Sequence, residues 1–180
     1  ILPALARSPH FKQMFVREAK ISALLSHPNI VQVYDLGKVG DDHFIAMEHI
    51  HGRDLTRTVR RLRAQSQRLP MGLAVYVTAC VARGLAYAHG RSDPSGRPAP
   101  IVHRDVSPHN VILSFEGEVK LLDFGIARLL EDAQDAPEVT GQPGGGKFAY
   151  MSPEQAIGGR VDHRSDLFSC GIVLYELLVN

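Results

Sequence analysis

The sequence is poor in the residues that mark several protein classes. It has 2 cysteines and no tryptophan, and 20 lysines and arginines against 19 aspartates and glutamates leave a formal charge of +1. Neither a disulfide framework nor a polyanion-binding role is indicated, and Cys80 and Cys170 suggest reduced core thiols of a cytosolic protein. No signal peptide follows Ile1, and no apolar run reaches the roughly 18 residues that cross a bilayer. The 180 residues are typical of about one globular domain.

Hydrophobic periodicity predicts a mixed α+β chain. Apolar residues at helical spacing predict four helices, at 10–26, 54–64, 70–89 and from 164 onward. Runs rich in β-branched residues predict two strand pairs, at 30–36 with 43–50 and at 111–114 with 119–122. The segment 131–146 has no periodicity and is predicted to be a long functional loop.

The most informative stretch is His103-Arg104-Asp105-Val106-Ser107-Pro108-His109-Asn110, which is followed by Asp123-Phe124-Gly125. The Glu116-Gly117 pair between the two strands predicts a two-residue hairpin turn. That turn would place Asn110 opposite Asp123, with the two residues roughly 5 Å apart. Their oxygens suit Mg²⁺, and Asp105 on the adjoining loop can accept a hydrogen bond from an incoming hydroxyl. The arrangement predicts metal-assisted phosphoryl transfer.

Each piece of this constellation also has a simpler interpretation. An Asp-Phe-Gly triplet alone is a common turn, and an asparagine ahead of a strand is often a cap. The combination with His-Arg-Asp at this distance makes coincidence a poor explanation.

With these residues the sequence resembles a protein kinase domain, most closely the eukaryotic-like serine/threonine kinases of bacteria. The resemblance covers nearly the whole chain through motifs in the family's order, among them His27-Pro28-Asn29-Ile30-Val31, the catalytic loop, Asp123-Phe124-Gly125, Tyr150-Met151-Ser152-Pro153-Glu154 and Asp166-Leu167-Phe168-Ser169-Cys170-Gly171. The implied fold is the bilobal α+β kinase fold. It would comprise an incomplete β-rich N-lobe over 1–50 with a hinge at 47–50, and a mainly helical C-lobe over 51–180 with an activation segment at 123–154.

The resemblance also implies a role for each motif residue. Asp105 would be the catalytic base, and Asn110 and Asp123 would be the Mg²⁺ ligands of an ATP site. Around the nucleotide, Met47 would be the gatekeeper, the backbone of Glu48 and Ile50 would meet adenine, and Ile112 would form the pocket floor. Structural roles would fall to His103, Arg104, Phe124, Gly125, Glu154 and Asp166, the last bracing the catalytic loop.

Glu18 can be argued from the residues alone. It lies on the apolar stripe of the first predicted helix, where a carboxylate needs a cationic partner. In the family this partner is a lysine on the preceding strand, which would make Glu18 part of the ATP site. No such strand and no Gly-rich loop precede it, and Lys12 lies nearly opposite on the helix. The alternative is that Glu18 snorkels to solvent.

The missing lysine suggests that the chain is a piece of a kinase domain. The final helices of the family also lie beyond Asn180, together with the arginine expected to pair with Glu154. We expect the 180 residues alone to be weakly active or inactive.

Two positions inside the matched region depart from the family pattern. Ser107 stands where Ser/Thr members have a lysine that touches the transferred phosphate, and Lys147 replaces a threonine that contacts the catalytic aspartate. We hypothesise that Lys147 supplies the cation that Ser107 cannot. The alternative is that Lys147 is solvated and Ser107 merely caps a turn.

The loop 131–146 contains a phosphorylation candidate. Thr140 is the only serine or threonine between Phe124 and Met151, and Arg104 is of the type that holds a phosphorylated loop in the family. The glycine run ending at Lys147 is like a phosphate-binding P-loop, but Phe148 occupies the position that needs a hydroxyl.

The leading function is therefore ATP- and Mg²⁺-dependent phosphorylation of serine or threonine on protein substrates, in cytoplasmic bacterial signalling, with a kinase dimer for autophosphorylation. No nucleic acid is expected as a partner, because the arginines at 53–68 occupy one helix face without interleaved aromatics. The alternative is a catalytically silent kinase-like scaffold or nucleotide-binding module. Asp105, Asn110 and Asp123 argue against it, whereas Ser107 keeps it open.

Overall fold

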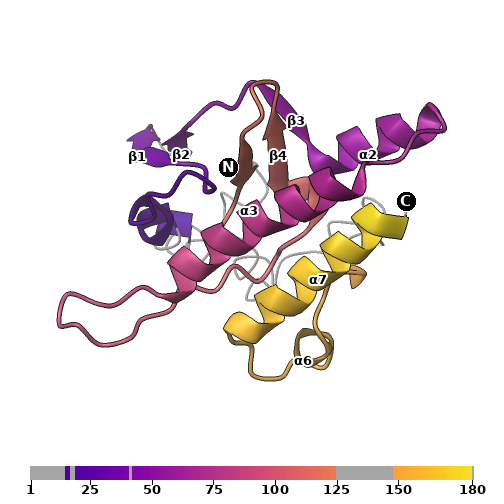
Figure 1. The fold of residues 1–180 in the computed structure, drawn as a ribbon. Helices are drawn as coiled ribbons and strands as arrows, with labels where there is room; N and C mark the ends of the chain where they lie inside the picture. Colours follow the sequence, from indigo (N-terminus) through magenta and orange to yellow (C-terminus); the bar gives the residue numbers. More distant parts are fainter. Residues whose placement is uncertain (1–14, 17–18, 41, 125–147, 180) are drawn as a thin grey trace.

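The computed structural model describes residues 15–16, 19–40, 42–124 and 148–179. After helical residues at 15–16 and 19–23, the elements are β1 (Val33–Val39), β2 (Asp42–Met47), β3 (Gly52–Asp54), α2 (Leu55–Ala64), α3 (Met71–His89), the 3-10 helix η2 (Pro108–Asn110), β4 (Val111–Ser114), β5 (Val119–Leu121), α6 (Pro153–Ala156) and α7 (His163–Val179). The predicted α+β class is confirmed, with two small sheets beside a helical part (Figure 1).

The first sheet pairs β1 with β2 in antiparallel orientation. β1 begins at Val33, later than predicted, because the chain before it pairs elsewhere. Ile30 forms a parallel bridge with Leu121 of β5, and the N–H of Val31 donates to the Leu121 carbonyl at 2.9 Å. The segment before β1 is thereby joined to the strand that leads to Asp123.

The hairpin between β4 and β5 has a longer turn than predicted. The N–H of Ser114 donates to the Glu118 carbonyl at 2.9 Å, so the turn contains the three residues 115–117. Gly117 supplies the left-handed backbone, with φ of 93°, that such a turn needs at its last position. The Ser114 hydroxyl also accepts hydrogen bonds from the N–H groups of Glu116 and Glu118. These bonds favour the three-residue turn over the two-residue one.

The longer turn shifts the register at the other end of the hairpin. Val111 pairs with Leu121, and the N–H of Leu122 donates to the carbonyl of Asn110 at 2.8 Å. Asn110 therefore lies opposite Leu122, and the predicted pairing of Asn110 with Asp123 is wrong. Asp123 is the next residue along the chain, where the backbone leaves the sheet.

The helix α2 begins where the sequence predicts. The Asp54 carboxylate accepts a hydrogen bond from the N–H of Arg57 at 2.8 Å, which caps the first turn. Leu55 and Val59 are buried on the inner face, while the arginines lie on the outer face.

The core is centred on α3, which packs against β5 and α7 (Figure 1). Its inward residues are Ala74, Val77, Cys80, Val81, Gly84, Leu85 and Ala88. The backbone of Asn29 approaches α3 closely at Gly84, where a Cβ would lie 3.1 Å from the Asn29 carbonyl oxygen. Glycine allows this close approach. Among the described residues, α3 is the one helix long and apolar enough to cross a membrane by length and composition, with mean hydropathy 1.4. Such helices also form the cores of globular domains. The sequence analysis expected no apolar segment of this length and is corrected at α3.

Both cysteines are buried and unpaired in this core. Burial raises the pKa of the Cys170 thiol to about 11, and the nearby Asp166 carboxylate adds to the shift. The thiol therefore stays protonated at neutral pH, as expected for a packing residue.

On the other side of α7, a set of large apolar side chains remains exposed, namely Leu167, Phe168, Tyr175, Leu178 and Val179.

Candidate active site

The loop 103–110, which is the predicted catalytic loop, is anchored by the buried imidazole of His103. The N–H of Asp105 donates to its Nδ1 at 3.2 Å, so that Nε2 carries the proton and donates to the Leu122 carbonyl at 2.7 Å. The ring also contacts the ring of Phe124, with centroids 4.6 Å apart. One side chain thus links the loop carrying Asp105 to the strand end carrying Asp123.

Asp166 of α7 holds the backbone of the same loop through hydrogen bonds. Its carboxylate is buried and accepts hydrogen bonds from the N–H groups of His103 at 2.8 Å and Arg104 at 2.7 Å. It also contacts Nε2 of His89 at 2.7 Å. Arg104 has a left-handed backbone, with φ of 69°, which is costly for a residue other than glycine. The two N–H bonds to Asp166 hold that conformation.

The amide of Asn110 is oriented by Asp105. Its Nδ2 donates to the Asp105 carbonyl at 2.7 Å and to the Asp105 carboxylate at 3.0 Å. Both amide hydrogens therefore point towards the loop, and the amide oxygen points the other way. That oxygen accepts no hydrogen bond in the part of the chain that the structure describes, and Asn110 is buried. Such an acceptor suits a cation.

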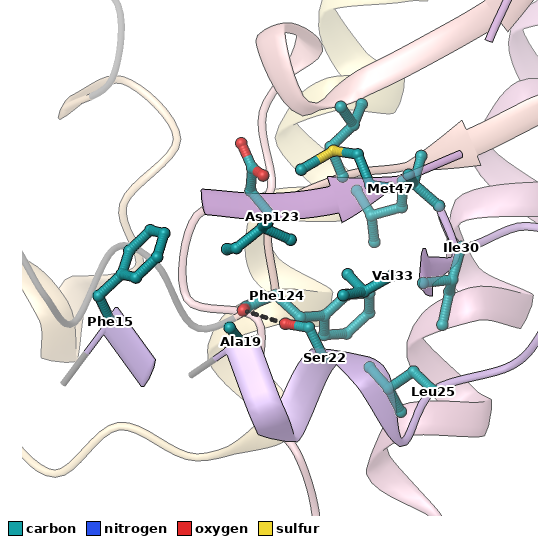
Figure 2. Close-up of a pocket in the computed structure, with 13 residues that line it drawn as sticks. Phe15, Ala19, Ser22, Leu25, Ile30, Val33, Met47, Asp123 and Phe124 are labelled. Atoms are coloured by element: carbon teal, nitrogen blue, oxygen red, sulfur yellow. Dashed lines mark hydrogen bonds between the residues drawn. The ribbon is translucent and has the colours of Figure 1, made fainter. Parts of the chain in front are cut away.

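Asp123 stands at the exit of β5 in a left-handed conformation, with φ of 59°. Aspartate and asparagine tolerate this region better than most residues. Figure 2 shows the Asp123 carboxylate pointing to the opposite side from the Phe124 ring, which is buried. The Ser22 hydroxyl of the N-terminal helix donates to the Phe124 carbonyl at 3.0 Å. This bond ties the backbone at Phe124 to the N-terminal helix.

A cavity of about 20 Å³ lies beside Asp123. Met47, Ile45 and Val33 of the first sheet line it together with Phe124 and Leu25 (Figure 2). Its volume is large enough for about one water molecule. The predicted gatekeeper Met47 thus lies near the metal-ligand candidate.

The predicted hinge leaves two backbone groups open. The N–H of Glu48 already donates to the Gln32 carbonyl at 2.8 Å, whereas its own carbonyl accepts no hydrogen bond from the part of the chain that the structure describes. The N–H of Ile50 has no hydrogen-bond acceptor among the described residues. A carbonyl acceptor and an N–H donor two residues apart match the edge of a planar heterocycle that needs one of each. Ile112, the predicted pocket floor, lies half-buried in the middle of β4.

The Glu48 side chain has a partner that the sequence analysis did not assign. Its carboxylate pairs with Nζ of Lys120 on β5 and accepts the N–H of Gln32 at 3.1 Å. The exposed fractions of the side chains are 10% for Lys120 and 21% for Glu48. The ion pair therefore connects the predicted hinge to the strand that precedes Asp123. A lysine within a buried strand was the signal that could have revealed it.

Breaking this ion pair should loosen the hinge. We expect Lys120→Met to lower the free energy of unfolding by about 1–3 kcal/mol, since it leaves Glu48 without a cation in a site sheltered from water. Urea unfolding of the single variants and of Lys120→Met with Glu48→Gln would measure the coupling. The double variant should recover part of the loss. Additive losses would show that the pair contributes nothing.

The segment 148–156 is fastened to the catalytic loop. Ser152 and Gln155 form a capping box at α6, and Nε2 of Gln155 donates to the Arg104 carbonyl at 2.8 Å. Glu154 accepts the Ser165 hydroxyl, which with its own N–H and Ser152 holds the pKa of this carboxyl below its usual value. Within the described residues Glu154 therefore contacts a serine rather than an arginine.

Ser107 is buried, and its hydroxyl has no hydrogen-bond partner among the residues that the structure describes. It precedes η2 but makes no side-chain capping bond, so the interpretation that it merely caps a turn is not supported. A buried unpaired hydroxyl costs about 1–3 kcal/mol. The other predicted site residues Glu18, Gly125, Thr140 and Lys147 lie outside the described residues.

The donors present fit a hard divalent cation bound together with a polyphosphate. No group of three His, Cys, Asp or Glu side chains that could hold a metal occurs in the described ranges. Asn110 and Asp123 offer an amide and a carboxylate oxygen, and Mg²⁺ is usually held by one or two carboxylates plus substrate phosphates and water. The chain alone would bind such an ion weakly.

Comparison with known proteins assigns the chain to a family. The model of the protein kinase domain matches residues 4–180. The chain belongs to the protein kinase family. This kinase domain is 41% identical over 180 residues to the tyrosine-protein kinase MasK of Myxococcus xanthus. The aligned region covers 100% of the chain and 27% of MasK. It is 38% identical over 178 residues to the serine/threonine-protein kinase PknB of Mycobacterium leprae. Here the aligned region covers 97% of the chain and 26% of PknB.

A solved structure shows the same fold. The PknI kinase domain of Mycobacterium tuberculosis matches with a TM-score of 0.71 at 30% identity, over 98% of this chain and 60% of that one. The predicted family and fold are thereby confirmed. The kinase domain described here spans about a quarter of the length of the curated relatives.

Proposed function

We propose that the protein is an ATP- and Mg²⁺-dependent kinase that phosphorylates serine and threonine on proteins. The observation that carries this proposal is the orientation of Asn110, whose amide donates to Asp105 and leaves its oxygen for a cation. Lobes over 1–50 and 51–180 with a hinge at 47–50 would hold the nucleotide between them.

In this proposal Asp105 orients the attacking hydroxyl. Asn110 fixes the carboxylate by donating to its Oδ2, and His103 fixes the backbone at the same residue. The other carboxylate oxygen then accepts the hydrogen bond of the hydroxyl and receives its proton as the phosphate is transferred. Such positioning removes much of the entropy cost of bringing hydroxyl and phosphate together.

Asn110 and Asp123 would hold Mg²⁺, which when bound neutralises phosphate charge. At the other end of the nucleotide, the Glu48 carbonyl and the Ile50 N–H would bind the adenine edge, with Ile112 below the ring. Met47 would limit the depth of the pocket. The nucleotide would thus lie between the hinge and the end of β5.

Phosphoamino-acid analysis tests the proposal. The full-length protein would be incubated with γ-labelled ATP, Mg²⁺ and a mixed protein substrate, and the labelled residues would be separated after acid hydrolysis. We expect phosphoserine and phosphothreonine. Phosphotyrosine alone would favour the activity named for MasK. No label at all would favour the kinase-like scaffold.

The orphaned hydroxyl of Ser107 is compatible with a cation supplied from elsewhere, and Lys147 is the candidate. We expect Lys147→Ala to lower kcat by about tenfold or more, because one cation beside the transferred phosphate is lost. Introducing Ser107→Lys into that variant should restore part of the rate. Steady-state phosphotransfer assays would measure both, and undiminished turnover of Lys147→Ala would refute the compensation.

The proposal also covers how the kinase is regulated and where it acts. Thr140 would be phosphorylated and its phosphate held by Arg104, in a cytoplasmic kinase that dimerises for autophosphorylation. Phosphopeptide mapping of the active full-length protein would test the site.

A further inference from the structure

An open groove of about 420 Å³ is lined by residues that include neither Asp105 nor Asp123. One wall is a single face of α2 with its C-cap residue, formed at helical spacing by Thr58, Arg61, Leu62 and Gln65. The other wall is the β3–β4 edge and the start of the hairpin turn. α2 runs beside these strands in Figure 1.

The groove combines an apolar floor with cationic rims. Leu62 and Leu113 are half-buried in it, and Phe115 is 62% exposed at its end. The Phe115 backbone is fixed because its N–H donates to the His51 carbonyl at 3.0 Å. The His51 ring packs edge-on against the Phe115 ring, with centroids 4.9 Å apart. The aromatic side chain is therefore held in place while a large part of it faces water.

The two arginines of the groove have no carboxylate partner in the described ranges. Arg53 on β3 and Arg61 on α2 stand on opposite walls, and both are exposed. By contrast, Arg57 pairs with Asp54 and Arg63 pairs with Glu176 outside the groove. The segment 53–68 contains one acidic residue, Asp54, and six arginines, namely Arg53, Arg57, Arg60, Arg61, Arg63 and Arg68. In a chain whose formal charge is only +1, this concentration of cations is local.

We propose that this groove docks a linear segment of the protein substrate in which glutamates or aspartates alternate with leucine-like residues. In an extended segment, successive side chains point to opposite sides, so carboxylates can reach Arg53 and Arg61 while apolar side chains enter between Leu62 and Leu113. The use in substrate selection rests on the proposed kinase activity. The binding itself does not.

A peptide fits the groove better than a nucleic acid or an anionic membrane. Single-stranded nucleic acids bind through several stacked aromatic side chains, and among the described residues Phe115 is the only aromatic one that lines this groove. A membrane surface requires a flat or convex basic face, whereas these arginines flank a hollow with an apolar floor.

Fluorescence anisotropy of the full-length protein tests the docking. The probe is a fluorescein-labelled octapeptide of alternating glutamate and leucine. One comparison peptide replaces glutamate by glutamine, and another replaces leucine by serine. We expect Arg53→Glu and Arg61→Glu each to raise Kd about tenfold or more, because each exchanges an attractive contact for a repulsive one. Arg60→Glu is the matched control, since Arg60 is exposed on the same helix but does not line the groove.

Specific outcomes would overturn the docking proposal. These are an equal loss in Arg60→Glu, equal binding of the glutamate–serine peptide, or no saturable binding. Tighter binding of single-stranded DNA or of phosphatidylserine vesicles that depends on Arg53 and Arg61 would assign the groove to those ligands. Self-association that the same two substitutions abolish, without peptide binding, would assign it to a second copy of the chain.

A kinetic measurement separates docking from catalysis. The docking octapeptide would be fused by a flexible linker to a phosphoacceptor peptide, and the two substitutions should raise KM for the fusion about tenfold while kcat is unchanged. Peptide binding without any phosphate transfer would leave the groove assigned and the proposed kinase function refuted. An unchanged KM would refute the role in substrate selection.

Discussion

Replacing Asp123 by asparagine is expected to lower phosphotransfer about a thousandfold, which corresponds to several kcal/mol of lost electrostatic stabilisation. The carboxylate is the one negatively charged oxygen donor offered by the Asn110–Asp123 pair. Its loss should raise the Mg²⁺ concentration required for half-maximal activity. The substitution keeps the backbone, because asparagine also tolerates the left-handed conformation found at φ 59°.

A Mg²⁺ titration of phosphotransfer at fixed ATP would measure this effect. Asp162→Asn serves as control, since Asp162 is bonded to Arg164 on the surface near the start of α7. It should leave the titration unchanged. An Asp123→Asn protein with wild-type Mg²⁺ dependence would exclude Asp123 as a metal ligand.

The second large effect is expected at Asp166. Asp166→Ala removes the acceptor of two backbone N–H groups, those of His103 and Arg104, and the partner of His89. Each buried donor left unpaired costs about 1–3 kcal/mol, so the free energy of unfolding should fall by about 3–5 kcal/mol. The left-handed conformation of Arg104 would then relax, and Asp105 would lose its position.

Asp166→Asn should fall between wild type and Asp166→Ala, because its single amide oxygen can still accept from part of the loop. Chemical denaturation would rank the three proteins, and steady-state kinetics should show a larger loss in kcat than change in KM for ATP. If Asp166→Ala kept wild-type stability and kcat, the carboxylate would not brace the loop.

Much of the architecture follows from local signals in the sequence. The strand β3 and its pairing with β4 were not predicted. The helices α2 and α3 and the pairing of β4 with β5 were predicted, because apolar periodicity and turn residues act over a few residues. The hairpin register was not, since it depends on whether Ser114 closes a turn of two or three residues. The sequence offers Glu116-Gly117 for either, and the Ser114 hydroxyl favours the longer one.

Contacts between distant segments were the harder part of the site. Motif order located Asp105, Asn110 and Asp123, but not the ion pair of Glu48 with Lys120 or the bond from Gln155 to the catalytic loop. These contacts connect residues far apart in the chain, and their side chains carry no local signature. They became visible only once β5, the hinge and α6 were placed in space.

The most direct test is phosphate transfer by the full-length protein with and without Asp105→Asn. With γ-labelled ATP, Mg²⁺ and a protein substrate, the wild-type protein should label serine and threonine. The Asp105→Asn protein should bind a fluorescent ATP analogue with unchanged affinity and transfer no phosphate above background. Undiminished transfer by Asp105→Asn, or no transfer by the wild-type protein under the same conditions, would contradict the assignment of this loop as a catalytic site.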